Sequence, residues 1–135
     1  KDGNKTVLSG VPDALPALIK SYRIQDKARN VGFDWKNKSQ VWDKVQEELN
    51  ELRVEVDKLD EKKMEEEFGD LMFSMINASR LYKINPENAL EKCNQKFIRR
   101  FNYVEKKAKE LGKELKDLSL EEMDEYWNEA KKNEL

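Results

Sequence analysis

Apolar residues recur at alternating spacings of three and four along most of this 135-residue chain. The clearest run consists of Trp42, Val45, Leu49, Leu52, Val56 and Leu59. This spacing predicts an amphipathic α-helix from about Gln40 to Leu59, with Ser39 as its N-cap. The chain has only five Gly and three Pro, too few for a β-sandwich rich in turns. The pattern therefore predicts an all-α fold.

Four further helices are expected on the same grounds. They span about residues 15–30, 60–83, 86–111 and 119–132. Pro16 suits the first turn of the first helix, Gly112 would end the fourth, and Ser119 with Glu122 forms a capping box for the last. We expect a four-helix-bundle-like domain over residues 14–135 with an additional C-terminal helix, preceded by a linker or N-terminal arm over residues 1–13.

The third of these helices is unusual in composition. Its middle, Phe68–Ala78, is apolar nearly all round, so we expect it to be the most buried element. On a single chain, Met72, Met75 or Ile76 would remain partly exposed, and such an apolar patch usually marks an interface. The sequence therefore predicts a homodimer or a higher homo-oligomer.

The charge balance limits the possible partners. The chain carries 26 Lys and Arg against 28 Asp and Glu, which gives no electrostatic case for binding a nucleic acid polymer or an anionic membrane. The absence of histidine excludes His-based zinc sites and Ser-His-Asp triads. One cysteine, Cys93, excludes an internal disulfide and fits a reducing compartment. The first residue is Lys1 rather than Met, from which we expect a piece of a longer protein.

The second helix carries a cluster of glutamates. Glutamate runs are usually solvated helix faces, but the helical wheel separates the members of this one. Glu48 borders the apolar stripe, Glu51 lies further round, and Glu47 faces solvent. Glu48 and Glu51 are therefore candidates for a site, and Glu47 is not.

The third helix carries a second pair of carboxylates, Glu67 and Asp70. Asp70, Ser74 and Asn77 form a polar stripe at spacings of four and three on an otherwise apolar helix. An aspartate in such surroundings is costly unless it is paired, hydrogen-bonded or metal-bound. No Lys or Arg lies within one turn of Asp70, and Glu67 adds like charge. A cation between the two carboxylates would relieve their repulsion.

Four oxygen donors without His or Cys suit a hard cation. Mg²⁺ is favoured over Ca²⁺ because no acidic loop resembles an EF-hand and the donors lie on stiff helices. Mg²⁺ held by carboxylates most often serves a phosphate-bearing substrate. The pattern therefore predicts a magnesium site that acts on phosphates.

These motifs resemble those of the all-α nucleoside triphosphate pyrophosphohydrolases of the MazG type, whose signature is similar to Glu48-x-x-Glu51 followed by Glu67-x-x-Asp70. Further similar segments, in the same order, are 15–18, 31–35, 65–77, 94–101 and 127–131. The likeness covers about Gly10 to Lys132, and the 31–35 loop looks like that of the C-terminal one of two tandem domains. The resemblance implies Mg²⁺-dependent hydrolysis of an NTP or dNTP to the monophosphate and pyrophosphate, in the cytoplasm, with Mn²⁺ as a possible substitute. Related families include the dimeric dUTPases and the dCTP pyrophosphatases.

The resemblance also implies roles for individual residues. Glu48, Glu51, Glu67 and Asp70 would be the metal ligands, and one of them would orient or deprotonate the attacking water. Lys96 and Arg100 match the family's basic pair, and their i, i+4 spacing places both at one border of the fourth helix's apolar stripe. They would neutralise charge on the phosphates. Trp127 and Lys131 match the family's C-terminal pair.

Several of these residues also have structural interpretations. Lys96 and Arg100 would equally form a solvated helix edge, and Trp127 would equally pack in the core. Asn77 would bind a ligand or make a core hydrogen bond. Trp35 or Phe33 would stack on a base, although loop aromatic residues more often pack against the protein.

The sequence contains no motif dedicated to reading a base, so base preference stays open. We expect a nucleotide-pool housecleaning enzyme with loose base selectivity. The alternatives are a base-specific relative, directed to dCTP or dUTP, and a non-catalytic helical dimerisation domain. The complete set of carboxylates, together with Lys96 and Arg100, argues against a non-catalytic domain.

Overall fold

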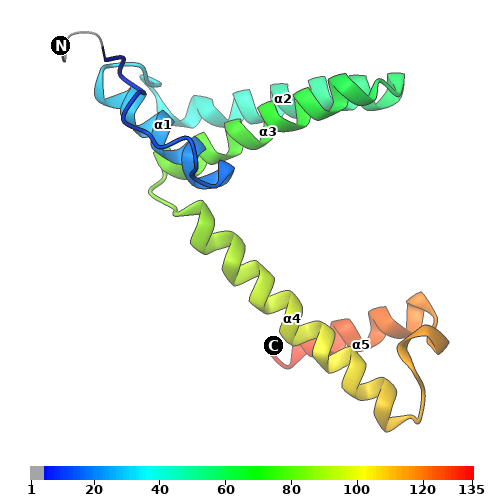
Figure 1. The fold of residues 1–135 in the computed structure, drawn as a ribbon. Coiled ribbons are helices and arrows are strands. Elements are labelled where there is room, and N and C mark those ends of the chain that lie inside the picture. Colours follow the sequence, from blue (N-terminus) through cyan, green and yellow to red (C-terminus); the bar gives the residue numbers. More distant parts are fainter. Residues whose placement is uncertain (1–4) are drawn as a thin grey trace. The chain divides into compact units, whose positions relative to one another are not determined.

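The computed structural model describes residues 5–135, which form helices and connecting turns without any strand (Figure 1). The expected all-α fold is confirmed. The chain divides into two units, one ending at Glu87 and the other running from Asn88 to Leu135. Residues 1–4 of the expected arm lie outside the described part. Over residues 5–135, no helix is both long and apolar enough to cross a bilayer.

The first unit contains α1 (Ala17–Asn30), α2 (Val41–Lys58) and α3 (Glu61–Leu81). Helices α2 and α3 lie side by side as an antiparallel hairpin, and α1 packs against α3 (Figure 1). Leu59 ends α2 in the left-handed region with φ 58°, and the Asp60 side chain caps α3 by accepting from the backbone N–H of Lys63. This tight connection aligns the two helices that carry the four candidate carboxylates.

Two helix starts differ from the sequence-based expectation. Ser39 is not the N-cap of α2, because it belongs to a short 3-10 helix, η2 (Lys38–Gln40), whose own N-cap is Asn37. The Asn37 side chain accepts from the backbone N–H of Ser39. Pro16 is the N-cap of α1 and not part of its first turn, because its ψ of 143° is extended. The Pro16 carbonyl accepts the first intrahelical bond, from the backbone N–H of Lys20 at 2.9 Å.

The expectation that Phe68–Ala78 is the most buried element is wrong for the single chain. Ile76 and Ala78 are buried, but Phe68 and Phe73 are exposed. Within the first unit, α1 and α2 cover only part of the circumference of α3, because helices contact one another along stripes. Met72 and Met75 are also exposed. An uncovered apolar face thus remains on α3, whereas Ile76 is not part of it.

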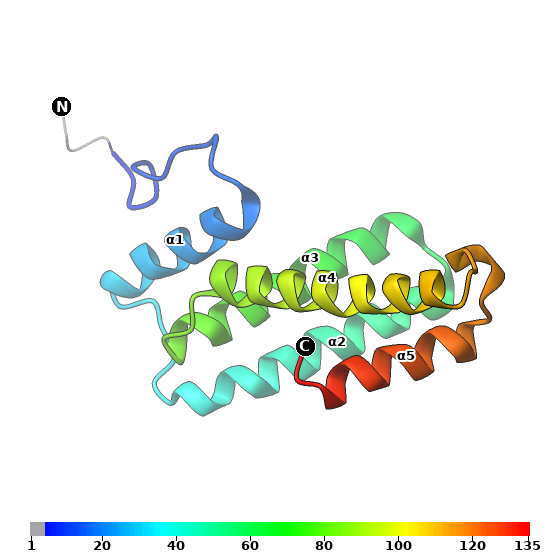
Figure 2. The same cartoon turned by 90° about the horizontal axis from the view of Figure 1, so that it is seen from below.

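The second unit contains most of α4 (Pro86–Glu110), the 3-10 helix η3 (Leu115–Asp117) and α5 (Leu120–Lys132) (Figure 2). Gly112 follows α4 with φ 68°, the left-handed conformation expected of a glycine that ends a helix. The capping box predicted for α5 is present, with Ser119 and Glu122 bonded reciprocally. The apolar centre of this unit is small and comprises Val104, Ala108, Leu118 and Ala130.

Candidate functional site

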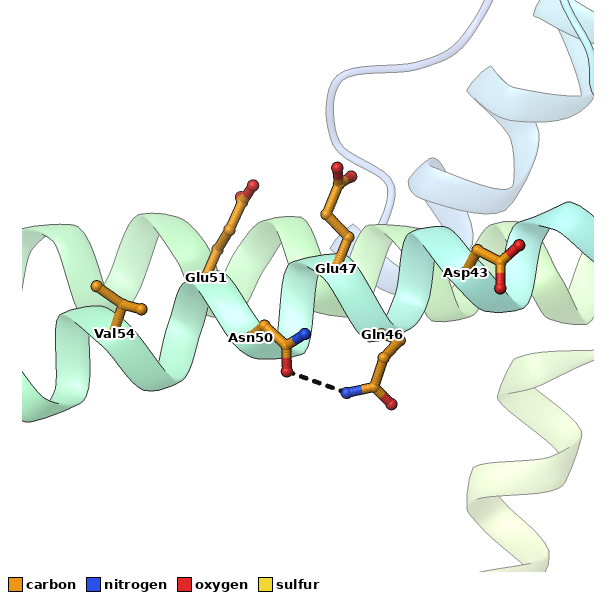
Figure 3. Close-up of a pocket in the computed structure, with 6 residues that line it drawn as sticks. All are labelled: Asp43, Gln46, Glu47, Asn50, Glu51 and Val54. Carbon is orange, nitrogen blue, oxygen red and sulfur yellow. Dashed lines mark hydrogen bonds between the residues drawn. The ribbon is translucent and has the colours of Figure 1, made fainter.

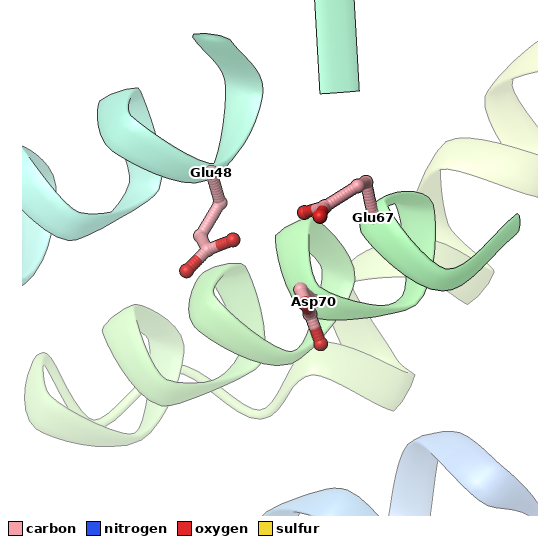
Figure 4. A group of neighbouring side chains, drawn as sticks. All are labelled: Glu48, Glu67 and Asp70. Atoms are coloured by element: carbon pink, nitrogen blue, oxygen red, sulfur yellow. The ribbon is translucent and has the colours of Figure 1, made fainter. Parts of the chain in front are cut away.

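Three of the four predicted carboxylates converge between α2 and α3. Glu48 comes from α2, and Glu67 and Asp70 come from α3 (Figure 4). One ligand oxygen from each of the three lies within 4.8 Å of the others. Glu48 is only 7% exposed, in agreement with its predicted place at the border of the core. The hairpin thus brings together residues that are distant in sequence.

Two carboxylate oxygens in this group are buried without a hydrogen-bond partner among residues 5–135. They are Oε2 of Glu48 and Oε2 of Glu67. Glu55, two turns beyond Glu48 on α2, holds a third such oxygen. Nearly all buried polar atoms in native proteins have a partner, and a hard cation would supply one to carboxylates. The donor set therefore fits Mg²⁺.

Like charge and burial raise the pKa of two of the predicted ligands. Loss of solvent raises the pKa of Glu67 first, and the charges of Asp70 and Glu48 raise it further. The charge of Glu48 is the main cause of the raised pKa of Glu51, with smaller effects of burial and of Glu67. Glu51 therefore interacts electrostatically with this cluster. It is not one of the three residues whose ligand oxygens lie within 4.8 Å of one another. Asp70 is exposed, in contrast to the buried surroundings expected for the middle of its helix.

The outer face of α2 carries polar side chains and one exposed apolar residue around a shallow depression of about 420 Å³ (Figure 3). The lining residues are Asp43, Gln46, Glu47, Asn50, Glu51 and Val54. Glu47 is exposed, which confirms the predicted helical phase. Glu51 shares this face with Glu47 (Figure 3), while its side chain remains within hydrogen-bonding range of Glu48 and Glu67.

Lys44 was not singled out from the sequence. Its Nζ lies 2.7 Å from Oε2 of Glu47 and 2.9 Å from Oε1 of Glu48. Hydrogen bonds to Glu47 and then Glu48 raise the pKa of Lys44, so its side chain stays protonated. The i, i+4 spacing from Lys44 to Glu48 was a signal that could have identified it.

A buried arginine ties the 31–35 loop to α3. Arg80 Nη2 donates to Oδ1 of Asp34 at 2.8 Å and to Oδ1 of Asn77 at 2.8 Å. The Arg80 side chain is 5% exposed, against 22% for Asp34. Sequence reasoning missed Arg80, although it extends the stripe of Asp70, Ser74 and Asn77 by three residues. Its pairing with Asp34 spans 46 residues and has no local signal.

The three hydrogen-bonded residues Asp34, Asn77 and Arg80 line a cavity of about 680 Å³ in the first unit. Glu48 and Asp70 line this cavity, and so do Trp35 and Asn77, two residues predicted to bind substrate. The backbone N–H of Trp35 donates to Oδ1 of Asp34 at 2.8 Å. This bond holds the backbone from which the Trp35 side chain extends. Two candidate ligands, Glu48 and Asp70, therefore line the same cavity as these two substrate-binding candidates.

The remaining candidates belong to the second unit. Arg100 Nε donates to the carbonyl of Leu135 at 2.9 Å, and its guanidinium lies 5.8 Å from the ring centre of Trp127. Trp127 also packs against Phe97, with ring centres 5.1 Å apart. Lys96 and Lys131 are exposed. Arg100 and Trp127 are thus neighbours within this unit.

The sequence of this chain is similar to that of a known protein family. Residues 37–105 match the model of the MazG nucleotide pyrophosphohydrolase domain. The chain belongs to this family. The matching MazG segment contains all four predicted carboxylates as well as Lys96 and Arg100, whereas Trp35, Trp127 and Lys131 lie outside it.

Two curated relatives match over most of the chain. The nucleoside triphosphate pyrophosphohydrolase/pyrophosphatase MazG of Thermotoga maritima is 45% identical over 117 residues, which cover 87% of this chain and 45% of that protein. The nucleoside triphosphate pyrophosphohydrolase of Escherichia coli K12 is 41% identical over 132 residues, 96% of this chain and 50% of that protein. The chain therefore spans about half the length of these MazG relatives.

Proposed function

We propose that the protein hydrolyses nucleoside triphosphates to the monophosphate and pyrophosphate. The observation that carries this proposal is the group of Glu48, Glu67 and Asp70, whose ligand oxygens lie within 4.8 Å of one another. In the reaction, water adds to phosphorus and the anhydride bond between the α- and β-phosphates breaks. The names of the two curated relatives support the same activity.

The proposed cofactor is Mg²⁺, with Mn²⁺ as a possible substitute. Glu48, Glu67 and Asp70 would hold it, and the unpartnered oxygens of Glu48 and Glu67 support this assignment. When bound, such an ion polarises phosphate oxygens and offsets their charge. Glu51 completes the proposed set on the strength of the family resemblance, and the charge of Glu48 is the main cause that raises its pKa.

The residues of the chain have distinct tasks in this scheme. One of the four carboxylates is proposed to orient or deprotonate the attacking water. Protonated Lys44, held by Glu47 and Glu48, supplies positive charge to the same cavity. Lys96, Arg100, Trp127 and Lys131 are proposed to bind the phosphates and nucleoside on the strength of the family resemblance.

We propose loose base selectivity and a role in nucleotide-pool housecleaning, in the cytoplasm, as a homodimer or higher homo-oligomer. The exposed apolar face of α3, with Phe68, Met72 and Met75, supports self-association. The alternatives are a relative specific for dCTP or dUTP and a non-catalytic dimerisation domain. The clustered carboxylates favour catalysis over the last alternative.

A panel of four NTPs and four dNTPs, assayed for released pyrophosphate with Mg²⁺ and with EDTA, tests the proposal. Turnover of most substrates that EDTA abolishes is expected. One preferred base would support the specific relative, and no turnover would support the dimerisation domain.

Single substitutions test the assignment of the ligands. Glu67→Ala and Asp70→Asn should abolish pyrophosphate release, because the loss of a ligand misplaces the metal. Glu47→Ala is the matched control and should stay within about threefold of the parent protein, because Glu47 is exposed and Lys44 keeps its contact with Glu48. Lys96→Ala and Arg100→Ala should lie between these extremes. A dead Glu47→Ala variant would refute the assignment of Glu48 and Glu51.

A further inference from the structure

Gln25 of α1 is a buried polar residue without an evident structural partner for one of its atoms. It is 7% exposed, and its Nε2 donates to the backbone carbonyl of Phe73 on α3 at 3.1 Å. A carbonyl only accepts, so this bond fixes which end of the amide is nitrogen. The other end, Oε1, is buried and has no hydrogen-bond partner among the described residues. Burial of an acceptor without a donor is unfavourable, so this atom is a candidate for hydrogen bonding to a ligand.

Gln25 lines the cavity of about 680 Å³ that also borders the candidate metal ligands. This volume lies within the range of roughly 300–1,000 Å³ that is typical of small-molecule sites. Three aromatic residues, Phe33, Trp35 and Phe73, line the same cavity, and Phe33 is 81% exposed. Exposed aromatic side chains beside a cavity offer flat surfaces for a planar ring.

A second amide in this cavity is restricted to donating. Oδ1 of Asn77 accepts from Nε and Nη2 of Arg80, at 3.1 and 2.8 Å. Asn77 therefore offers its Nδ2 as a donor, while Gln25 offers an acceptor. Arg80 is a positioning residue, because its bonds to Asn77 and Asp34 fix this amide and the aromatic loop together.

The side chains that line the cavity indicate which kind of ligand would bind there. Aromatic surfaces with one acceptor and one donor suit a planar ring with polar edges. Glu48, Asp70 and Lys44, which line the same cavity, suit the Mg²⁺-phosphate part of the same molecule. We propose that this cavity holds the nucleobase of the triphosphate, and that Gln25 Oε1 accepts an N–H from the edge of the base. This inference rests on the proposed function.

One consequence concerns selectivity. Adenine, guanine, cytosine, uracil and thymine all carry at least one N–H on the pairing edge of the ring. A single acceptor would therefore strengthen the binding of every base without choosing strongly among them. Loss of Gln25 should raise KM for all bases and leave kcat largely unchanged.

The test compares ATP with ribose 5′-triphosphate, which lacks a base. The parent protein should prefer ATP in kcat/KM. In Gln25→Met, which keeps the length of the side chain and removes the acceptor, this preference should fall about 2–10-fold, the effect of one neutral hydrogen bond. The fall should come from a higher KM for ATP, with ribose 5′-triphosphate unaffected. Gln46→Met is the matched control, because Gln46 is exposed on α2 and bonds to Asn50 at 3.1 Å.

Equal losses for both substrates in Gln25→Met, or no loss, would overturn the inference and indicate a structural role or a buried water as the partner of Oε1. An equal preference for the two substrates in the parent protein would overturn it as well, while the proposed function would stand. If the parent protein hydrolyses neither substrate, the proposed function fails, and calorimetric binding of both ligands with Mg²⁺ decides the cavity's role by the same comparison.

A second variant covers the case in which Gln25→Met does not fold. Ala28→Leu adds bulk at a residue that lines the same cavity. It should reduce kcat/KM for ATP more than for ribose 5′-triphosphate. Equal effects on the two substrates would overturn the inference.

Discussion

At the scale of single residues, the ion pair of Asp34 and Arg80 carries a testable pH dependence. The hydrogen bond from Arg80 is the main cause that lowers the pKa of Asp34 below its ordinary value of 3.8. A lowered pKa means that the contribution to stability is fully present above pH 3.8 and is lost as the pH falls through the lower, folded-state value. Asp34→Asn should therefore reduce the free energy of unfolding by about 1–3 kcal/mol at pH 7. The deficit should shrink below pH 3.8, as measured by urea unfolding followed by tryptophan fluorescence.

A second ion pair provides the control for this measurement. Asp26 and Arg29 lie 3.2 Å apart, but their side chains are 44% and 47% exposed. Exposed pairs contribute little, so Asp26→Asn should change stability by less than about 0.5 kcal/mol. A deficit in Asp34→Asn that persists unchanged at pH 3 would show that charge is not the cause.

At the scale of elements, the start of α5 depends on its capping box. The hydroxyl of Ser119 accepts from the backbone N–H of Glu122 at 3.1 Å, and the Glu122 side chain accepts from the backbone N–H of Ser119 at 3.0 Å. Ser119→Ala should destabilise the first turn by about 0.5–2 kcal/mol, seen as faster amide exchange over residues 120–123. Ser39→Ala should have little effect on α2, because the Asn37 side chain bonds the backbone of Ser39. Similar exchange in both variants would contradict this distinction.

The elements also show what the sequence could predict. Periodicity gave the phase of α2, so the burial of Glu48 and the exposure of Glu47 followed from spacing alone. It did not predict the exposure of Phe68 and Phe73, because the composition of a helix does not say how much of its surface the neighbouring helices cover. The burial of Gln25 had a sequence signal, because this polar residue lies three positions after Tyr22 on an apolar stripe. The hydrogen bond from Arg80 to Asp34 depends on tertiary packing, so no pattern of neighbouring residues in the sequence predicts it.

At the scale of the whole molecule, the clustered carboxylates make stability depend on metal. Glu48, Glu67 and Asp70 repel one another, and a cation that binds only the folded state stabilises it by mass action. Millimolar Mg²⁺ should therefore raise the thermal midpoint by a few degrees relative to EDTA. The rise should be absent in Asp70→Asn and retained in Glu47→Ala. Identical midpoints with and without Mg²⁺ in the parent protein would mean that the carboxylates bind no metal in the free protein.

The exposed apolar side of α3 favours self-association. Phe68, Met72 and Met75 expose a continuous apolar side of α3, and water contact with such a face is unfavourable at about 25 cal/mol per Å². Light scattering at micromolar concentration should give a particle at least twice the 16.0 kDa of the single chain. Met72→Lys should shift this equilibrium towards the monomer, because it places a charge within the apolar face, whereas Lys62→Glu on the exposed first turn of α3 should leave it unchanged. A particle of 16.0 kDa for the parent protein would show that the apolar side of α3 is not covered by a second copy.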